Sequence, residues 1–329
     1  MTRVLVTGAA GFLGGHLIQA LRAGGHQVVA LVRKGHLLEA EGVEVRVGDV
    51  LDAASVRAAA DEAHSAIVVG GSFIGAESAA SLRLRGLAVT LIEMGPRLMP
   101  QLGSQEVSDE LAELYREQGI EVLLETELAE LTGNGKLLTG ARTKDGATIE
   151  GYLAIVGIGV VPNVELAKEA GAEVDDGIVV DERFRSSLPD VYAIGDVARY
   201  PDSTSGRQRR IEHWSSANAQ GGHLGRQLAG SKDPYQELPV FFTQLFDKKF
   251  QVIGDPESAT ESVVRGSLAD GRLVGFHLTG EGQLVGAVVH GESADLVEEL
   301  KTVIRERPVI DDPVRLADEN VRPAEAVGA

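Results

Sequence analysis

Two glycine-rich loops constrain this chain most, because each stands between a short apolar strand and a predicted helix. The first loop contains Gly8, Gly11 and Gly14, and the second occupies residues 70–75 after the apolar run of residues 65–69. A strand, a glycine turn and a helix in this order form a dinucleotide-binding pattern, since glycine lets the backbone approach phosphate and a helix N-terminus attracts anions. The chain is therefore predicted to be an α/β protein with two Rossmann-like nucleotide-binding units and a C-terminal α+β interface domain.

The second loop carries the more complete set of binding residues. Gly70 is expected to form the tight turn, Ser72 to lie where the backbone approaches a pyrophosphate, and Gly75 to let helix and strand pack closely. Glu93 follows Gly75 by 18 residues and ends the next predicted strand. A carboxylate there can accept hydrogen bonds from both ribose hydroxyls and repel a 2′-phosphate. This loop is therefore predicted to bind NAD(H) rather than NADP(H).

Composition excludes several other classes of function. The 329 residues include no cysteine, so the chain has no disulfide, thiolate metal site or redox dithiol, and its eight histidines show no metal-ligand spacing. No metal is expected. A net charge of −18 argues against nucleic-acid and anionic-membrane partners. With no apolar run long enough to span a bilayer, a cytoplasmic protein is predicted.

The first loop has a family resemblance of its own. Its G-x-x-G-x-x-G spacing resembles the short-chain dehydrogenases and sugar-nucleotide epimerases over residues 1–64. That resemblance implies an adenine contact at Asp49 and an NADP-type selectivity position at Arg33. The catalytic Tyr-x-x-x-Lys of that family is absent from the chain. Because no other phenol–lysine pair replaces it, short-chain reductase or epimerase activity is disfavoured.

From residue 65 onward the chain resembles a second family more extensively. Four ordered motifs carry this resemblance, at residues 68–77, 157–163, 190–198 and 211–214. They are similar to the FAD-dependent pyridine nucleotide oxidoreductases of the ferredoxin/rubredoxin reductase and apoptosis-inducing-factor-like type. Two later stretches, residues 238–254 and 272–289, resemble that family's interface domain.

This resemblance implies roles for particular residues. Residues beside the reacting rings would be Glu77, His213 and Trp214. Residues that would hold FAD or NAD(H) are Gly157, Gly159, Gly195, Asp196 and Glu212. The resemblance also implies hydride transfer from NADH to FAD and then electron transfer to a small acidic carrier, a ferredoxin or rubredoxin. Arg207, Arg209 and Arg210 could steer such a carrier, or could simply form a solvated loop.

The predicted organisation has five parts. They are a short-chain-dehydrogenase-like segment at 1–64, an NAD(H)-binding domain at 65–163, the second half of an FAD-binding domain at 164–237, the interface domain at 238–305 and a tail at 306–329. A strand is expected at residues 191–194, and the tail is expected to run over the surface.

Residues 1–64 occupy the position in the chain where the related enzymes carry the first half of their FAD-binding domain. A hybrid that binds NAD(P) without flavin turnover therefore remains an alternative function, besides the disfavoured short-chain reductase or epimerase.

Overall fold

The computed structural model describes residues 3–6, 27–32, 44–47, 57–58, 60–133 and 138–327. The chain divides into two units. Unit 1 comprises Met1–Pro100, Ser108–Val161 and Leu245–Asp247, and unit 2 comprises Gln101–Val107, Pro162–Gln244 and Lys248–Ala329. This division is coarser than the five predicted parts, whose boundaries stay a prediction.

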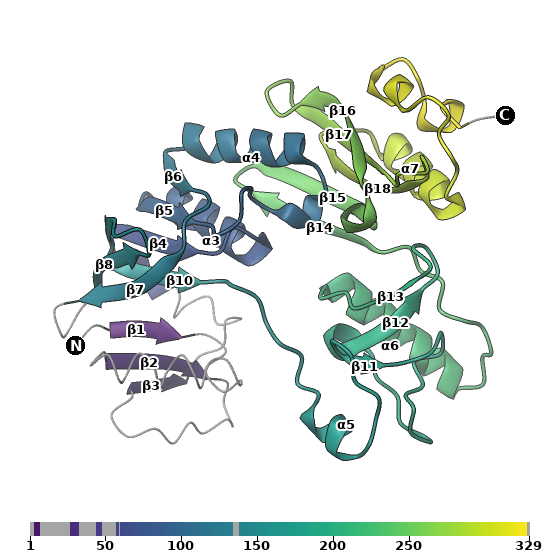
Figure 1. Cartoon of the computed structure of the whole chain (residues 1–329), viewed down its shortest axis with the longest axis horizontal. Coiled ribbons are helices and arrows are strands. Elements are labelled where there is room, and N and C mark those ends of the chain that lie inside the picture. Colours follow the sequence, from purple (N-terminus) through teal and green to yellow (C-terminus); the bar gives the residue numbers. More distant parts are fainter. Residues whose placement is uncertain are drawn as a thin grey trace. The chain divides into compact units, whose positions relative to one another are not determined.

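Unit 1 contains the parallel sheet that carries the second glycine loop (Figure 1). Its strands are β4 (Ser65–Val69), β5 (Ala88–Ile92), β6 (Ile120–Leu123) and β10 (Leu153–Val156), in the order β10-β4-β5-β6. Helix α3 (Phe73–Leu84) follows β4, and α4 (Gln105–Glu117) follows β5. Ala76, Ala79 and Ala80 are buried on α3, so small side chains let this helix lie close to the sheet.

An antiparallel meander covers part of this sheet. It consists of β7 (Leu128–Gly133), β8 (Leu138–Thr143) and β9 (Thr148–Glu150). Its buried side chains Leu131, Ala141 and Ile149 join Ile67 and Ile92 of the parallel sheet in one hydrophobic cluster. The meander therefore buries a strand face that would otherwise be exposed.

The first part of the chain forms a three-stranded parallel sheet. Its strands are β1 (Arg3–Val6), β2 (Gln27–Val32) and β3 (Glu44–Val47), in the order β1-β2-β3. Strand β1 confirms the short apolar strand predicted before the first glycine loop. The residues predicted to bind a nucleotide here, Gly8, Gly11, Gly14, Arg33 and Asp49, lie outside the described residues.

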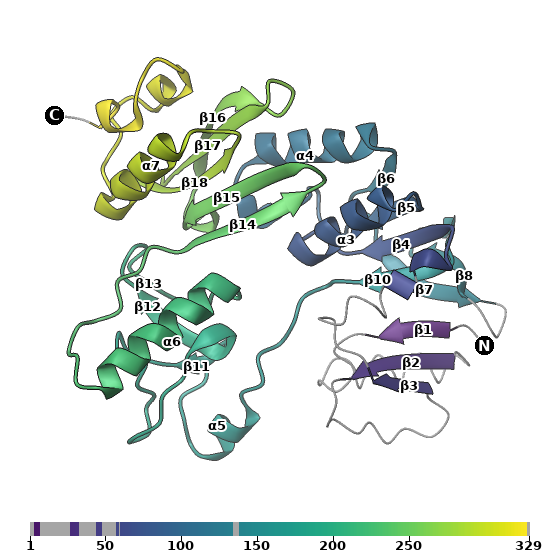
Figure 2. The same ribbon diagram turned by 180° about the vertical axis from the view of Figure 1, so that it is seen from behind.

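From Pro162 onward, unit 2 contains a small sheet with a helix beside it (Figures 1 and 2). The elements are α5 (Glu165–Glu169), β11 (Ile178–Val179), β12 (Ala198–Asp202), β13 (Arg207–Arg209) and α6 (Trp214–Leu228). Buried aromatic rings of Phe184, Tyr200 and Tyr235 form the centre of this core.

The prediction of a strand at residues 191–194 is wrong. Among the described residues this segment makes only an isolated bridge, between Arg185 and Tyr192. Its backbone bonds are local instead: Ala193 N–H donates to Phe184 O, and Val191 O accepts from Ser186 N–H. Apolar residues alone therefore did not make this segment a strand, because extended pairing requires a neighbouring strand in register.

A five-stranded sheet and one helix complete the chain. The strands are β14 (Val240–Leu245), β15 (Lys248–Gly254), β16 (Glu261–Ser267), β17 (Arg272–Leu278) and β18 (Leu284–His290), in the order β14-β15-β18-β17-β16. Helix α7 (Ala294–Glu306) buries Leu300 and Ile304 in the same cluster as Phe276. This confirms the predicted α+β interface domain.

The tail runs over the surface as predicted, since most of its described residues are exposed, but a few of its side chains are buried. Ile310, Leu316 and Ala326 are buried in the core of the five-stranded sheet. The buried Arg265 holds the tail, since its Nε donates to Leu316 O at 2.7 Å and its Nη2 to Val321 O at 2.9 Å. Short 3-10 turns space these apolar residues irregularly, so no helical or strand period revealed them.

Candidate functional site

Three glycines pack the second loop against the end of β10. Gly70 has φ +103°, and a Cβ added there would come under 3.0 Å from Gly157 O. A Cβ on Gly75 would come under 3.0 Å from Gly70 O, and a Cβ on Gly157 would lie 3.3 Å from Gly75 N. Gly70, Gly75 and Gly157, here called the glycine cradle, thus bring the turn, α3 and β10 into backbone contact. A larger residue at Gly70 or Gly75 would force them apart.

Helix α3 begins directly after this turn and has no side-chain cap at its N-terminus. Ser72 is its N-cap, its side chain makes no capping hydrogen bond, and no acidic residue stands in the first turn of this described helix. The first N–H groups of a helix have no partner within the helix and carry partial positive charge. The end of α3 is therefore suited to the phosphates of a dinucleotide.

Glu93 lies beside the loop, as its position at the end of β5 predicted. Its Oε2 accepts a hydrogen bond from Gly71 N–H at 2.5 Å, and its Oε1 accepts one from Gly95 N–H at 2.6 Å. A carboxylate has about four acceptor positions, so ribose hydroxyls can still bind. The sequence did not predict that Glu93 also holds the loop itself.

Gly159 lies on the segment that follows β10, at the same sheet edge as the glycine cradle. It has φ +98°, and a Cβ there would meet nothing within 4 Å. Because β10 and β4 are parallel neighbours, the segments after their carboxyl ends share one edge, where α/β folds bind ligands. Gly157 and Gly159 therefore lie at the sheet edge that carries the second glycine loop, and their role in holding a cofactor stays a prediction.

Glu77 stands on the second turn of α3 and is half-buried. Its neighbour Tyr115 is buried and was not predicted as a site residue. The Tyr115 hydroxyl donates a hydrogen bond to Ala76 O at 2.8 Å. Burial raises the pKa of Tyr115, and the negative charge of Glu77 raises it further. Tyr115 also packs edge-to-face on Phe246 at 5.2 Å. The helical spacing of Val107, Leu111 and Tyr115 along α4 is the signal in the sequence for this burial.

The second group of predicted residues lies in unit 2, at the N-terminus of α6. Gly195 (φ +74°), Asp196 and Val197 form one 3-10 turn, and the side chain of Asp196 is exposed. Arg210 Nη1 donates to Asp196 O at 3.1 Å and forms an ion pair with Glu212. The fold thus brings Asp196 and Glu212 together although 15 residues separate them.

His213 and Trp214 start α6. His213 is the N-cap, its Nδ1 accepts from Ser215 N–H at 3.1 Å, and its ring lies 4.6 Å from that of Phe241. Trp214 is 77% exposed, which leaves its indole open to a ligand or partner. Asp196, Glu212, His213 and Trp214 therefore form one cluster, here called the α6 cluster.

We expect the imidazole of His213 to titrate below its ordinary value of 6.5, because burial lowers its pKa while Asp196 opposes that shift. Asp196→Asn should lower this pKa further, whereas Asp190→Asn should not change it. The folded state binds the proton less readily, so the stability contributed by His213 is present above pH 6.5 and is lost as the pH falls. An NMR titration of the ring tests this, and an unchanged pKa in Asp196→Asn would contradict it.

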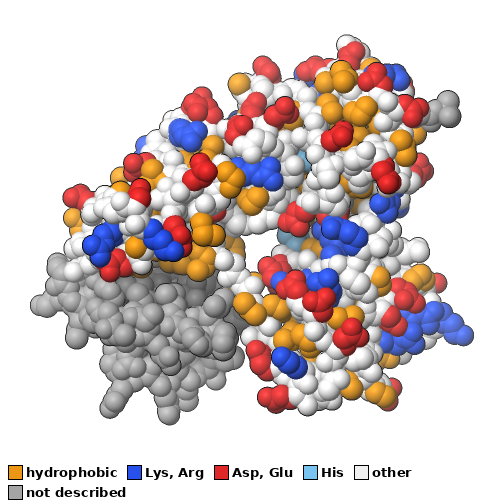
Figure 3. All heavy atoms as spheres, viewed as in Figure 1, with side chains coloured by type: hydrophobic (Ala, Val, Ile, Leu, Met, Phe, Trp, Pro, Cys, Tyr) orange, Lys and Arg blue, Asp and Glu red, His pale blue; other side chains and the backbone are white. Residues whose placement is uncertain are grey.

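The three arginines predicted as a docking patch are held in ion pairs. Arg209 Nη1 lies 3.1 Å from Asp202 and 3.2 Å from Asp255, and Arg207 Nη2 lies 2.6 Å from Asp255. Arg210 pairs with acidic neighbours and is 12% exposed. On the face shown in Figure 3, acidic and basic side chains are intermixed over the described surface. The arginines therefore have a structural role that the sequence did not predict.

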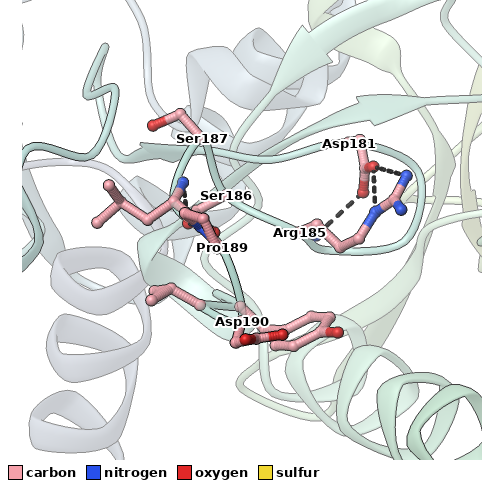
Figure 4. Close-up of a pocket in the computed structure, with 9 residues that line it drawn as sticks. Asp181, Arg185, Ser186, Ser187, Pro189 and Asp190 are labelled. Atoms are coloured by element: carbon pink, nitrogen blue, oxygen red, sulfur yellow. Dashed lines mark hydrogen bonds and ion pairs between the residues drawn. The ribbon is translucent and has the colours of Figure 1, made fainter.

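A pocket of about 470 Å³ lies elsewhere in unit 2 (Figure 4). Residues 185–192 and Asp181 line it, and Arg185 forms an ion pair with Asp181 at 2.6 Å. It includes no predicted site residue. Within the described part of the chain, no group of three or more acidic or histidine side chains could hold a metal ion, and no helix could cross a membrane.

Comparison with known sequences identifies the family. The profile of the pyridine nucleotide-disulphide oxidoreductases matches residues 23–221, and that of the reductase C-terminal domain matches residues 240–326. The first match starts inside the segment that resembles the short-chain dehydrogenases. Since the chain has no cysteine, it carries no redox disulfide of its own.

Relatives and solved structures agree with this match. Rhodocoxin reductase of Rhodococcus erythropolis is 32% identical over 89% of this chain and 69% of its own length. The ferredoxin–NAD(+) reductase subunit of the benzene 1,2-dioxygenase system of Pseudomonas putida is 33% identical over 77% of this chain, which spans 60% of that relative. The ferredoxin reductase for the CYP199A2 system from Rhodopseudomonas palustris superposes with a TM-score of 0.79 and 28% identity, over 92% of this chain and 75% of that one.

These findings support FAD and NAD(H) as the cofactors. They also agree with the architecture, in which a parallel nucleotide-binding sheet precedes an antiparallel C-terminal sheet. The chain belongs to the pyridine nucleotide-disulphide oxidoreductase family, in its FAD-dependent, ferredoxin reductase type.

Proposed function

We propose that this chain is an NADH-dependent FAD oxidoreductase that passes electrons from NADH to a small ferredoxin- or rubredoxin-type protein. The glycine cradle carries the proposal, because its backbone contacts leave no room for side chains at Gly70 and Gly75. With the N-terminus of α3 and Glu93, it offers a dinucleotide a close backbone, N–H donors and a ribose acceptor.

The α6 cluster fits a flavin by its donor and acceptor groups. The exposed carboxylate of Asp196 can accept a hydrogen bond from the ribityl chain, and the start of α6 can donate N–H groups to the carbonyl edge of the ring. Trp214 can cover a ring face because its indole is exposed. When bound, FAD supplies the acceptance of hydride and the release of single electrons.

Electrons must leave the chain through an external acceptor, because no cysteine is present to form an internal disulfide. A small acidic carrier suits this role. Arg207 is the candidate contact among the three arginines, because its side chain is 55% exposed while those of Arg209 and Arg210 are 17% and 12% exposed. Arg207→Ala would then slow reduction of the carrier more than reduction of a small artificial acceptor.

The visible spectrum of the purified protein, reconstituted with FAD, tests the proposal. We expect a flavin spectrum that NADH bleaches without oxygen and that a ferredoxin restores. A colourless protein that still binds NADH would overturn flavin turnover and favour the NAD(P)-binding hybrid. Turnover of a sugar nucleotide or alcohol without flavin would instead favour the short-chain reductase or epimerase.

Glu93 should set the preference for NADH over NADPH. Glu93→Gln removes the negative charge that repels a 2′-phosphate and weakens the ribose bonds, so the NADH/NADPH ratio of second-order rate constants should fall about tenfold. Glu113→Gln, on the exposed surface of α4, is the matched control. Anaerobic stopped-flow reduction measures both ratios, and an unchanged ratio in Glu93→Gln would contradict the assignment.

A further inference from the structure

A buried amide connects α6 to the turn that carries Asp196. Gln220 lies on α6 and is fully buried. Its Oε1 accepts a hydrogen bond from Gly195 N–H at 2.7 Å, and its Nε2 donates to Ser216 Oγ at 3.1 Å. Because the Oε1 faces an N–H donor and the Nε2 faces a hydroxyl, both ends of the amide have suitable partners.

The turn is also held from its other side. Arg210 Nη1 donates to Asp196 O at 3.1 Å, and Arg210 itself is fixed by Asp176 through bonds of 2.9 and 3.1 Å. Gly195 has φ +74°, a conformation that disfavours residues with a side chain. Two side chains thus fix a backbone turn that is otherwise a single 3-10 turn with few bonds of its own.

We propose that Gln220 is a positioning residue that sets the direction of the Asp196 carboxylate toward the flavin, an inference that rests on the proposed function. Burying an amide costs free energy unless its polar atoms are bonded, and Gln220 meets this condition through its bonds to Gly195 and Ser216. The hydrogen bond to Gly195 N–H lies one residue before Asp196. The Gln220 amide therefore acts on the backbone of the turn that carries Asp196, and it does not contact the flavin.

Gln220→Met tests this with little change of volume, and Gln227→Met, on the same helix, is the matched control. Gln227 donates to Asp233 O at 2.8 Å and has no bond to the turn. In the FAD-free protein, hydrogen exchange at Gly195 N–H should become faster in Gln220→Met and stay unchanged in Gln227→Met. Equal exchange rates at Gly195 N–H in the two variants would show that Gln220 does not hold the turn, whether or not the chain binds flavin.

A double-mutant cycle separates positioning from simple stabilisation. FAD dissociation constants are measured by flavin fluorescence for the native chain, Gln220→Met, Asp196→Asn and the double variant. Losing one oriented hydrogen bond should weaken FAD binding up to about tenfold, so we expect Asp196→Asn to cost about tenfold in the native chain and under about threefold in Gln220→Met. Equal costs in both backgrounds would overturn the inference. Absence of FAD binding by the native chain would instead overturn the proposed function.

Discussion

Gly75→Ala is expected to abolish measurable NADH binding and to lower the free energy of unfolding by about 3 kcal/mol. The added Cβ would meet the Gly70 carbonyl under 3.0 Å, and that oxygen belongs to backbone, which cannot rotate away as a side chain can. The start of α3 must then shift from the loop. A displacement of about 1 Å in a binding site can cost roughly 100-fold in function, which would move NADH binding out of the measurable range.

Gly225→Ala is the control, and it should raise the free energy of unfolding where Gly75→Ala lowers it. Gly225 lies inside α6, is exposed, and an added Cβ there would meet nothing within 4 Å. Replacing glycine by alanine at such a helical position should stabilise the chain by about 1 kcal/mol. Urea unfolding and NADH fluorescence titration measure both effects. If Gly75→Ala also stabilised the chain, or bound NADH as the native chain does, the packing role of Gly75 would be refuted.

The sequence predicted the parts of the site that depend on local order. A strand, a glycine turn and a helix follow one another directly, so Gly70, Gly75 and Glu93 could be assigned from spacing, and the structure places them at one sheet edge. Their binding roles stay predictions. Gln220 could not be found in this way, because its contact with Gly195 joins residues 25 positions apart and depends on how α6 lies against the turn.

Predictions failed where a segment depends on its tertiary neighbours. The apolar run at 191–194 has strand composition, yet its hydrogen bonds go to the preceding loop. The tail is mostly exposed, as its proline and aspartate content suggests, but that composition did not reveal its hydrogen bonds with the buried Arg265. Charge was the hardest property to interpret, because a run of arginines looks the same in sequence whether the side chains face solvent or buried carboxylates.

Arg209→Met should lower the free energy of unfolding by about 3 kcal/mol, because removing one partner of a buried ion pair leaves charge uncompensated. Asp202 and Asp255 have side chains that are each 1% exposed, and Arg209 lies 3.1 and 3.2 Å from them. Methionine keeps an unbranched apolar side chain at this position and removes the charge. Arg272→Met is the control, since Arg272 pairs with Glu319 at 3.4 Å with both side chains more than half exposed, and such pairs contribute about 0–1 kcal/mol.

Chemical unfolding and stopped-flow reduction of a ferredoxin, measured on the same variants, separate the two roles of this arginine cluster. If Arg209 is structural, Arg209→Met loses stability, while the native fraction reduces the carrier at the native rate and with the native dependence on salt. If Arg209 docks the carrier, stability stays near that of Arg272→Met and the rate falls most at low ionic strength, where attraction between charged surfaces is strongest. The burial of both carboxylates leads us to expect the first result, since Arg209 is directed toward Asp202 and Asp255 and has little surface left for a partner.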